Sequence, residues 1–431
     1  MFKKLLVLFV AGIVFAGCKK NFTPLYDNHR TLEDIYGDAG YAEGVLLNAY
    51  SRLPTNTWSF SEVATDDAVT NDKSSPLLNI ATGAWSAAVN NPAAVDQWNN
   101  SYSAIMYINL FLREADSVNW APMSGRNVRI MFTDRLKGEA YGLRALFMFH
   151  LLQAHAGYST SGELLGVPII TEALEPNSDF RRPRNTFDQC MQQIYADLAE
   201  SEKYLPLDYL FQDITNASQL PAKYSGMAPA DYNRVFGRFN RQRMSGRIVK
   251  AIRAKAALLA ASPAFNPQST ASKWEAAANF AGEVLTLNGG ISGLDPQGHL
   301  FYTNANASLI NINPSSGSPV DQREMLWRGS IVNTSALEIA NYPPTLFGNG
   351  RVNPTQNLVD AFPMANGYPI TNPASGYVAT NPYANRDPRL RNYVVVDNTT
   401  MRSTTIRTNN DNPTNPDAVD RLPTSTRTGY Y

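Results

Sequence analysis

The chain of 431 residues has little of what most catalytic and metal sites are built from, with only two cysteines and four histidines. The histidines show no H-E-x-x-H spacing and do not cluster with cysteine, so the sequence predicts no metal site. Cys190 falls at the start of an expected helix, where we expect a small buried side chain rather than a reactive thiol. His150 and His155 lie on or near another expected helix and are interpreted as packing residues.

Catalytic motifs are also lacking. The sequence contains no G-x-S-x-G elbow, no phosphate-binding Walker loop and no G-x-G-x-x-G. Asp66, Asp67, Asp72 and Glu338 could supply the carboxylate pair of a glycosidase, but their spacing does not show that any two face each other. We therefore predict no enzyme, no catalytic residue and no cofactor. A hydrolase with two carboxylates roughly 5–10 Å apart is kept as an alternative.

The chain has no net charge, because 37 basic residues balance 37 acidic ones, and charged residues make up only 17%. No basic block is found, and phosphate binding needs a concentrated cationic face. Nucleic acid is therefore not predicted as a partner. Asn, Ser, Thr, Pro and Tyr are plentiful, and a surface of this kind suits neutral, hydroxyl-rich ligands.

The N-terminus lacks an apolar run of the ~18–20 residues that a membrane-spanning helix needs. Instead, Lys3 and Lys4 precede a short apolar run that ends at Ala16-Gly17-Cys18, which predicts a signal peptide over residues 1–17. The junction resembles a bacterial lipobox, although Phe15 stands where such sites usually carry Leu. We expect lipid on Cys18, a polar tether over residues 18–30 and attachment to a membrane without spanning it. The alternative is an ordinary cleaved signal. With Cys18 acylated, no disulfide can form within the chain.

Helical periodicity dominates the first two thirds of the chain. It predicts six helices, which begin at Thr31 (with Asp34 completing a capping box), near Pro92, at Asp134, at Thr186, at Ser245 and at Ser272. The segment 134–156 is apolar on more than one face and is expected to be central. The last two helices should form an antiparallel hairpin of the tetratricopeptide type. After residue 290 we expect short strands, at 324–332 and 393–397, among turns and long loops.

Six segments of the chain have the composition of recurring motifs. They are Trp98 with Tyr102, Ile105 and Asn109, then Gly138-Glu139-Ala140 through Leu143-Arg144-Ala145, Gly166-Val167-Pro168, Gly246-Arg247 through Lys255-Ala256 with Trp274, 353–362, and Asn385-Arg386-Asp387-Pro388. Together they resemble the SusD/RagB family of outer-membrane nutrient-binding lipoproteins. Their order and spacing run from end to end of the chain. The resemblance implies a mainly α fold, a SusD-like helical scaffold with tetratricopeptide-like hairpins decorated by long loops and a few short strands.

The shared motifs also predict structural roles. Glu139 and Arg144 should lie in internal salt bridges, because an unpaired charge on a buried helix is costly. Three further expectations are Asn353 as a helix cap before Pro354, a turn at Asn366-Gly367, and Arg386-Asp387 holding a loop against the frame. Ligand contacts are therefore expected in the variable loops.

The resemblance implies a cell-surface protein of the outer membrane that captures oligosaccharides and delivers them to a SusC-like TonB-dependent transporter. The family's ligand surface comes from the loop before the Trp98 helix and from about 295–350. We expect Trp98, Trp274 and Trp327 in the core, and Trp58, Trp85 and Trp120 in loops. The candidate ligand-binding residues are Trp58, Asn71, Asp72, Trp85, Tyr302 and Tyr342.

Two alternatives stay open within binding. RagB-like members are associated with peptides, and a helical-repeat adaptor would hold a protein complex together without a small ligand. For the organisation, we expect a single domain over 31–431, with a scaffold over about 31–290 and a loop-rich ligand-capping part over about 291–431. Family members usually continue past a segment like 428–431, so we expect a truncated frame with an uncovered apolar helix face.

Overall fold

The computed structural model describes residues 36–54, 61–86, 97–295, 324–327, 329, 335–409 and 414–418. The signal peptide, Cys18 and the end of the chain at Tyr431 lie outside these ranges, so the expectations about them stay predictions. The division of the scaffold at residue 290 likewise stays a prediction.

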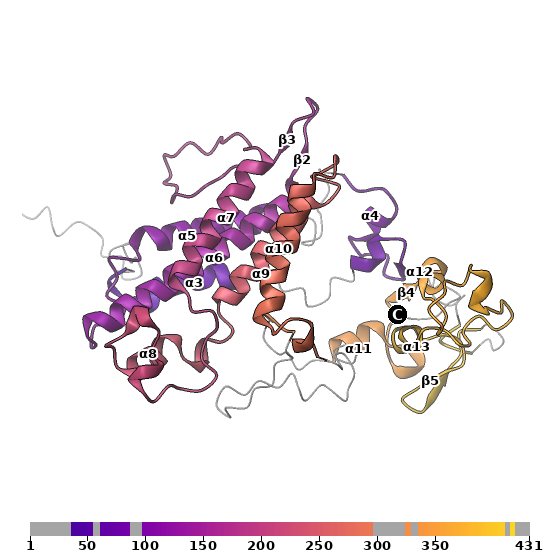
Figure 1. The fold of residues 1–431 in the computed structure, drawn as a ribbon. Helices are drawn as coiled ribbons and strands as arrows, with labels where there is room; N and C mark the ends of the chain where they lie inside the picture. The colour runs from indigo at the N-terminus through magenta and orange to yellow at the C-terminus, as the bar shows by residue number, and fades with distance from the viewer. Residues whose placement is uncertain are drawn as a thin grey trace, which may run out of the picture.

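A frame of packed helices forms the larger part of the described chain (Figure 1). Its helices are α3 (Ala39–Ser51), α5 (Trp98–Glu114), α6 (Arg126–His155), α7 (Phe187–Tyr204), α8 (Pro229–Phe236), α9 (Gly246–Ala261) and α10 (Ala271–Leu287). A short hairpin of β2 (Gly157–Tyr158) and β3 (Leu164–Leu165) follows α6. The prediction of a mainly α fold is confirmed, and no helix in the described ranges is both long and apolar enough to cross a membrane.

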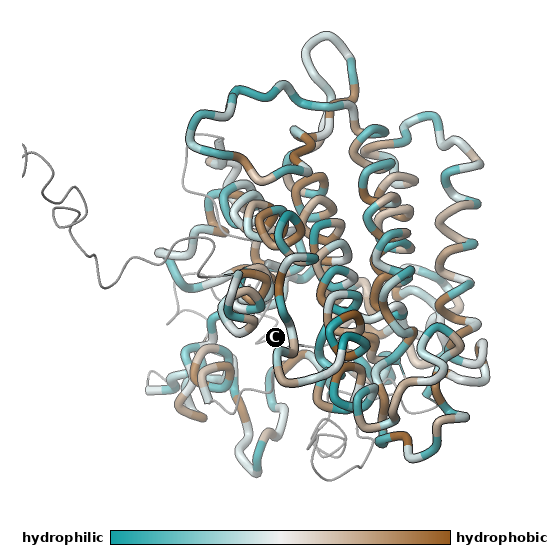
Figure 2. Tube along the Cα trace, turned by 90° about the vertical axis from the view of Figure 1, so that its left-hand side faces the viewer, coloured by the Kyte–Doolittle hydropathy of each residue, from teal (hydrophilic) through white to brown (hydrophobic). Residues whose placement is uncertain are grey.

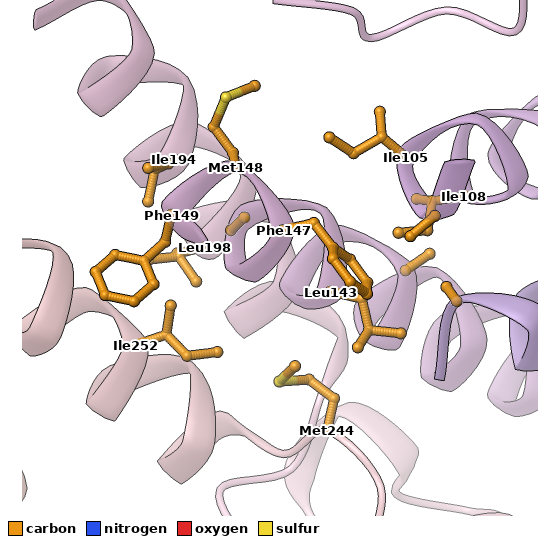
Figure 3. Close-up of a cluster of buried hydrophobic side chains, with 14 of the residues drawn as sticks. Ile105, Ile108, Leu143, Phe147, Met148, Phe149, Ile194, Leu198, Met244 and Ile252 are labelled. Carbon is orange, nitrogen blue, oxygen red and sulfur yellow. The ribbon is translucent and has the colours of Figure 1, made fainter. Parts of the chain in front are cut away.

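Helix α6 is central, as its apolar pattern predicted. Its side chains reach neighbours on both sides, with Phe147 toward Ile108 of α5 and Phe149 toward Leu198 of α7 and Ile252 of α9 (Figure 3). All five belong to one cluster of buried residues, which we call the main core. Along the helices of the frame, hydrophobic and hydrophilic residues alternate (Figure 2).

Helix boundaries follow local capping chemistry. The Thr186 hydroxyl accepts from the Gln189 backbone N–H, and the Gln189 side chain accepts from the Thr186 backbone N–H, so α7 starts where predicted. The Ser245 hydroxyl accepts from the Ile248 backbone N–H and so caps the start of α9. The first described cap is Asp38, which accepts from Gly40 N at 2.8 Å, whereas the expected box at Thr31 precedes the described residues. Helix α6 begins at Arg126, earlier than expected.

Close packing explains the glycines of the α6 motif. A Cβ added at Gly138 would lie 2.6 Å from the Leu205 side chain, and one at Gly142 would lie 2.7 Å from Met244. Real Cβ atoms do not approach neighbours so closely, so larger residues here would force α7 and the start of α9 outward.

The buried charges of α6 are paired, as predicted. Glu139 is fully buried and accepts from the Tyr50 hydroxyl at 2.8 Å, while Arg243 and Arg135 lie 3.2 and 3.4 Å from it. Arg144 makes a bidentate pair with Asp197, with its Nε 2.8 Å from Oδ2. These pairs are buried on several helices at once, so each specifies how those helices sit together.

A second region, which we call the loop-rich unit, consists of residues 61–86, 335–409 and 414–418. Its elements are β1 (Ala68–Thr70), α4 (Leu78–Ala81), α11 (Ala336–Asn341), β4 (Val352–Pro354), α12 (Gln356–Ala361), α13 (Pro388–Tyr393), β5 (Thr399–Met401) and β6 (Thr404–Ile406). Strands β1 and β4 pair antiparallel with Val69 opposite Asn353, and β5 pairs with β6. Figure 1 shows this unit to the right of the frame.

Two local predictions in the loop-rich unit are wrong. Asn353 and Pro354 are strand residues of β4, and the cap of α12 is Thr355, whose hydroxyl accepts from Leu358 N. Residues 393–397 do not form a strand, because Tyr393 ends α13; the strand pair follows at Thr399. The described part of 324–332 contains no strand either. Pairing with the distant strand β1 decided the place of Asn353 and Pro354, and local patterns do not contain that information.

Three tryptophans differ from expectation. Trp98 and Trp274 are each 39% exposed rather than in the core, and Trp98 instead stacks edge-on against Tyr102 and His155. Trp120, expected in a loop rather than in the core, does lie outside the helices, but it is buried and donates from Nε1 to Ala115 O at 3.0 Å. Trp327 packs against the main core as expected. A ring at a helix start or in a turn can be buried or exposed by neighbours that the local sequence does not specify.

Candidate ligand-binding site

The candidate site is built on the segment 342–351 of the loop-rich unit. Tyr342 follows α11, and the Gly350 N–H donates back to the Tyr342 carbonyl at 3.0 Å. Asn349 N donates to Ile339 O at 2.8 Å, so the segment is closed by its own backbone. We call this segment the 342–351 turn. A turn held by backbone hydrogen bonds positions its side chains without needing a core beneath it.

Asn71 ties the N-terminal part of the chain to this turn. Its side-chain amide donates to Asn349 O at 2.8 Å and accepts from the Arg351 guanidinium at 3.2 Å. Asp72, next to it, accepts from the Ser74 hydroxyl at 2.6 Å and from the Ser74 backbone N–H at 3.0 Å. Both hydrogen bonds lower the pKa of the Asp72 carboxyl, and the one from the Ser74 hydroxyl has the larger effect. The structure therefore places two predicted residues, Asn71 and Tyr342, on one hydrogen-bonded assembly.

Tyr342 is covered by a cation. The Arg402 guanidinium lies over its ring, 4.9 Å from the ring centre. Arg402 and Ser403 connect β5 to β6 and have φ angles of 48° and 66°, both in the left-handed region. Such two-residue turns usually carry Asn-Gly, because other residues are strained there. The hairpin keeps this strained turn with Arg402 against the ring.

Phe347 is the residue that sequence analysis missed. Its φ of 65° is unusual for an aromatic residue, and its side chain is 94% exposed. Strained, exposed positions of this kind are more frequent at binding sites than elsewhere. The local sequence Pro343-Pro344 before it and Gly348 after it marked a rigid turn with one ring on it, and that was the available signal.

A hollow of about 240 Å³ opens beside the turn. Its lining includes Thr345 from the turn, Thr405 and Arg407 from the β6 region, and Asn409 and Asp417. Asp417 Oδ1 accepts from the Thr345 backbone N–H at 3.0 Å, which joins the hollow to the turn. Hydroxyl, amide, cation and carboxylate groups thus line one small space, and together they can donate to and accept from a polyhydroxylated molecule.

Of the other predicted site residues, the described Trp85 is not joined to this assembly. Trp85 follows α4 and is half exposed, but no hydrogen bond or ring contact among the described residues links it to the 342–351 turn. Trp58 and Tyr302 lie outside the described residues. Their roles, and that of Asp72 as a ligand contact, stay predictions.

Metal and acid–base chemistry find no support in the described ranges. No group of three or more His, Cys, Asp or Glu side chains there could hold a metal ion. His155 accepts from the Gln97 backbone N–H at 3.2 Å, and burial lowers the pKa of His150 to about 4, so both act as packing residues. The Cys190 thiol is buried, donates to Val167 O at 3.2 Å, and has its pKa raised by burial, as expected for an unreactive thiol.

Comparison with known proteins adds the family. A family model described as "Starch-binding associating with outer membrane" matches residues 41–228, and the SusD family model matches residues 315–431. No curated protein matches the chain.

Two solved structures share the fold. A SusD-like protein from Bacteroides fragilis NCTC 9343 is 17% identical with a TM-score of 0.61, over 95% of this chain and 70% of that one. A SusD-like carbohydrate-binding protein from the same organism is 16% identical with a TM-score of 0.53, over 88% of this chain and 63% of that one. At these identities the likeness concerns the fold alone, and the chain spans 70% and 63% of the two structures' lengths. The two family matches, in the predicted order along a frame of the same architecture, show that the chain belongs to the SusD/RagB family.

Proposed function

We propose that this protein captures oligosaccharides at the cell surface and delivers them to a SusC-like TonB-dependent transporter, without catalysing a reaction. The family descriptions name starch binding and the outer membrane, and one structure of the same fold is titled a carbohydrate-binding protein. Lipid on Cys18 would hold the protein at the outer membrane, facing outward. No cofactor is needed, because capture requires only stacking and hydrogen bonds.

The observation that carries the proposal is the polar hollow, with the exposed Phe347 two residues along the chain from Thr345, which lines it. The C–H face of a sugar is apolar and stacks on an aromatic ring, while its hydroxyls both donate and accept hydrogen bonds. Arg407 can donate to such a hydroxyl and Asp417 can accept from one, and both line the hollow next to Thr345. A neutral sugar satisfies a cation and a carboxylate side by side better than a charged ligand does.

A titration of single-ring variants tests the site. Phe347→Ala should weaken binding of a glycan-array hit about tenfold, because stacking on one ring contributes on the order of 1–3 kcal/mol by analogy with nucleobases. Trp85→Ala should have an effect of similar size if Trp85 joins the ligand surface. The melting temperature should stay unchanged, because Phe347 is 94% exposed and its removal uncovers little apolar surface.

Phe180→Ala is the matched control, since Phe180 is another exposed ring, on a loop of the frame. It should bind glycan as the parent does. Calorimetry in which Phe347→Ala binds as tightly as Phe180→Ala would remove the hollow as the site. If the parent protein bound peptides but not glycans, the proposed ligand class would have to change from oligosaccharides to peptides.

A further inference from the structure

Exposed apolar side chains gather where α8 packs on the start of α6. Met123 is 98% exposed and Phe239 is 71% exposed, and Phe211 is also exposed. Arg234 of α8 donates to the Ser124 hydroxyl at 2.8 Å, so the turn that carries Met123 adjoins α8. A cluster of large apolar side chains exposed to water at one end of a molecule marks an interaction site.

The same end carries an excess of arginine. Among the residues that the structure describes, no carboxylate lies within ion-pair distance of Arg126, Arg129, Arg234 or Arg238. The Arg238 guanidinium lies over the Phe239 ring at 5.2 Å, and its Nε is buried without a hydrogen-bond partner in that part of the chain. Two acidic residues at this end, Asp213 and Asp231, also form no ion pair with the described residues, so the arginines outnumber them. We call these four arginines, with Met123, Phe211 and Phe239, the cationic end.

The excess has a sequence origin that the analysis of net charge missed. Residues 232–274 contain Arg and Lys but no Asp or Glu, so the prediction that the chain has no basic block is wrong in this stretch. Farther along it, Arg247 pairs with Asp208, and Arg253 pairs with Glu202 and Glu283 of neighbouring helices. Arg234 and Arg238 have no such neighbour in the described structure. In the described structure, acidic residues of neighbouring helices therefore neutralise the later arginines of this stretch but not Arg234 and Arg238 of the cationic end.

The described chain begins beside this end. Glu43, in the first turns of α3, pairs with Arg243 at 2.7 Å and with Arg135 at 3.4 Å. Arg135 in turn donates to Asn240, two residues after Arg238. Tyr36 lies 18 positions after Cys18. A random-coil chain of that length has a root-mean-square span of roughly 23 Å. Lipid on Cys18 would thus keep this end of the molecule nearest the membrane.

We propose that the cationic end rests on the membrane surface, where its arginines bind anionic headgroups and its exposed rings and Met123 enter the headgroup layer. The choice of partner rests on the lipid anchor of the proposed function. Guanidinium groups bind phosphate oxygens in bidentate fashion, and stable anchoring commonly combines an acyl chain with a basic patch. Figure 1 shows α8 at the lower left and α12, α13 and β5 at the right, so the candidate ligand site then lies away from the membrane.

Vesicle sedimentation of the full chain with Cys18→Ser tests the surface without the anchor. This protein should bind phosphatidylcholine vesicles only when they contain phosphatidylglycerol, and added salt should release it. Arg234→Gln with Arg238→Gln should weaken that binding about 25-fold, because each arginine near an anionic surface contributes about fivefold. Phe239→Ser should weaken it as well. Arg391→Gln, which removes one charge from exposed α13 of the loop-rich unit, should leave it unchanged.

The proposal would be overturned if the parent did not bind anionic vesicles, if the Arg234/Arg238 double variant bound them equally well, or if Arg391→Gln lost as much binding per removed charge. If the double variant melts early, Phe239→Ser decides the question. An acidic protein that binds the parent in place of vesicles would also overturn it. Glycan titration and the mass of the residue at position 18 are read separately, so failure of capture or of acylation is distinguishable from failure of this surface.

Discussion

The frame and the loop-rich unit are held together by different forces. In the frame, the main core runs without interruption from α3 to α9 and fully buries side chains as large as Phe111, Phe147 and Phe187. In the loop-rich unit, the buried apolar residues form two small clusters, one around Val63 and Val352 and one around Val359. Burial of apolar surface, at about 25 cal/mol per Å², therefore stabilises the frame far more than the loop-rich unit.

Polar side chains replace a core in the loop-rich unit. Arg386 is almost fully buried and donates to the carbonyls of Val359, Phe362 and Pro382. The Thr355 hydroxyl both caps α12 and donates to Asp67 O at 3.1 Å. The difference suggests a division of roles: burial fixes the frame, and hydrogen bonds from a few side chains position loops whose other polar groups remain available for a ligand.

The largest effect is expected in the frame. Glu139→Ala leaves Arg135 and Arg243 without their buried carboxylate, and breaking a buried pair from one side costs about 3–5 kcal/mol. Urea unfolding should show this loss over the whole helical transition. A change under 1 kcal/mol would mean that water or Glu43 takes the place of Glu139, and the contrast between the regions would weaken.

A smaller, local effect is expected in the loop-rich unit. Arg386→Met removes donors from three carbonyls, and buried acceptors left unpaired cost about 1–3 kcal/mol. Hydrogen exchange should accelerate over 356–395 while amides of α6 and α7 keep their protection. Equal acceleration in α6 would show that the two regions unfold as one.

The smallest effects are expected when a threonine helix cap is removed from each of the two regions. Thr186→Ala and Thr355→Ala each remove a threonine cap, which typically costs about 1 kcal/mol. Thr186→Ala should lower the main melting transition slightly. Thr355→Ala should leave that transition in place and raise exchange at β1, because its hydroxyl also joins β4 to Asp67. Identical profiles for the two variants would contradict a separate loop-rich unit.

The sequence predicted what is decided locally. Thr186 with Gln189, and Ser245, marked helix starts because a cap and its partner are three residues apart. Glu139 and Arg144 were assigned to internal pairs because burying a single charge is costly. The turn at Asn366-Gly367 is also present, with Gly367 at a φ of 84°. In each case the physical cause lies within a few residues, or in the burial of one side chain.

What depends on distant neighbours could not be predicted. Asn353 was assigned to a cap because it precedes Pro354, a residue typical of the first helical position, and only pairing with Val69 makes it a strand residue. Trp98 and Trp120 exchanged roles because tertiary contacts, not spacing, decide their burial. For the candidate site, Asn71 and Tyr342 were named but Phe347 was not, since its exposure depends on the turn beneath it.

The pairing of β1 with β4 has a consequence for the order in which the protein forms. The hydrogen bond from Asn71 to Asn349 joins residues 278 positions apart. Helices α5 to α10 lie between them and can pack as they emerge, because their contacts are mostly with near neighbours in the chain. Residues 61–86 must wait until β4 has been synthesised. During that interval Val63 and Leu77 expose apolar surface, so this segment is where we expect the unfinished fold to be most prone to aggregate or to bind a holding chaperone.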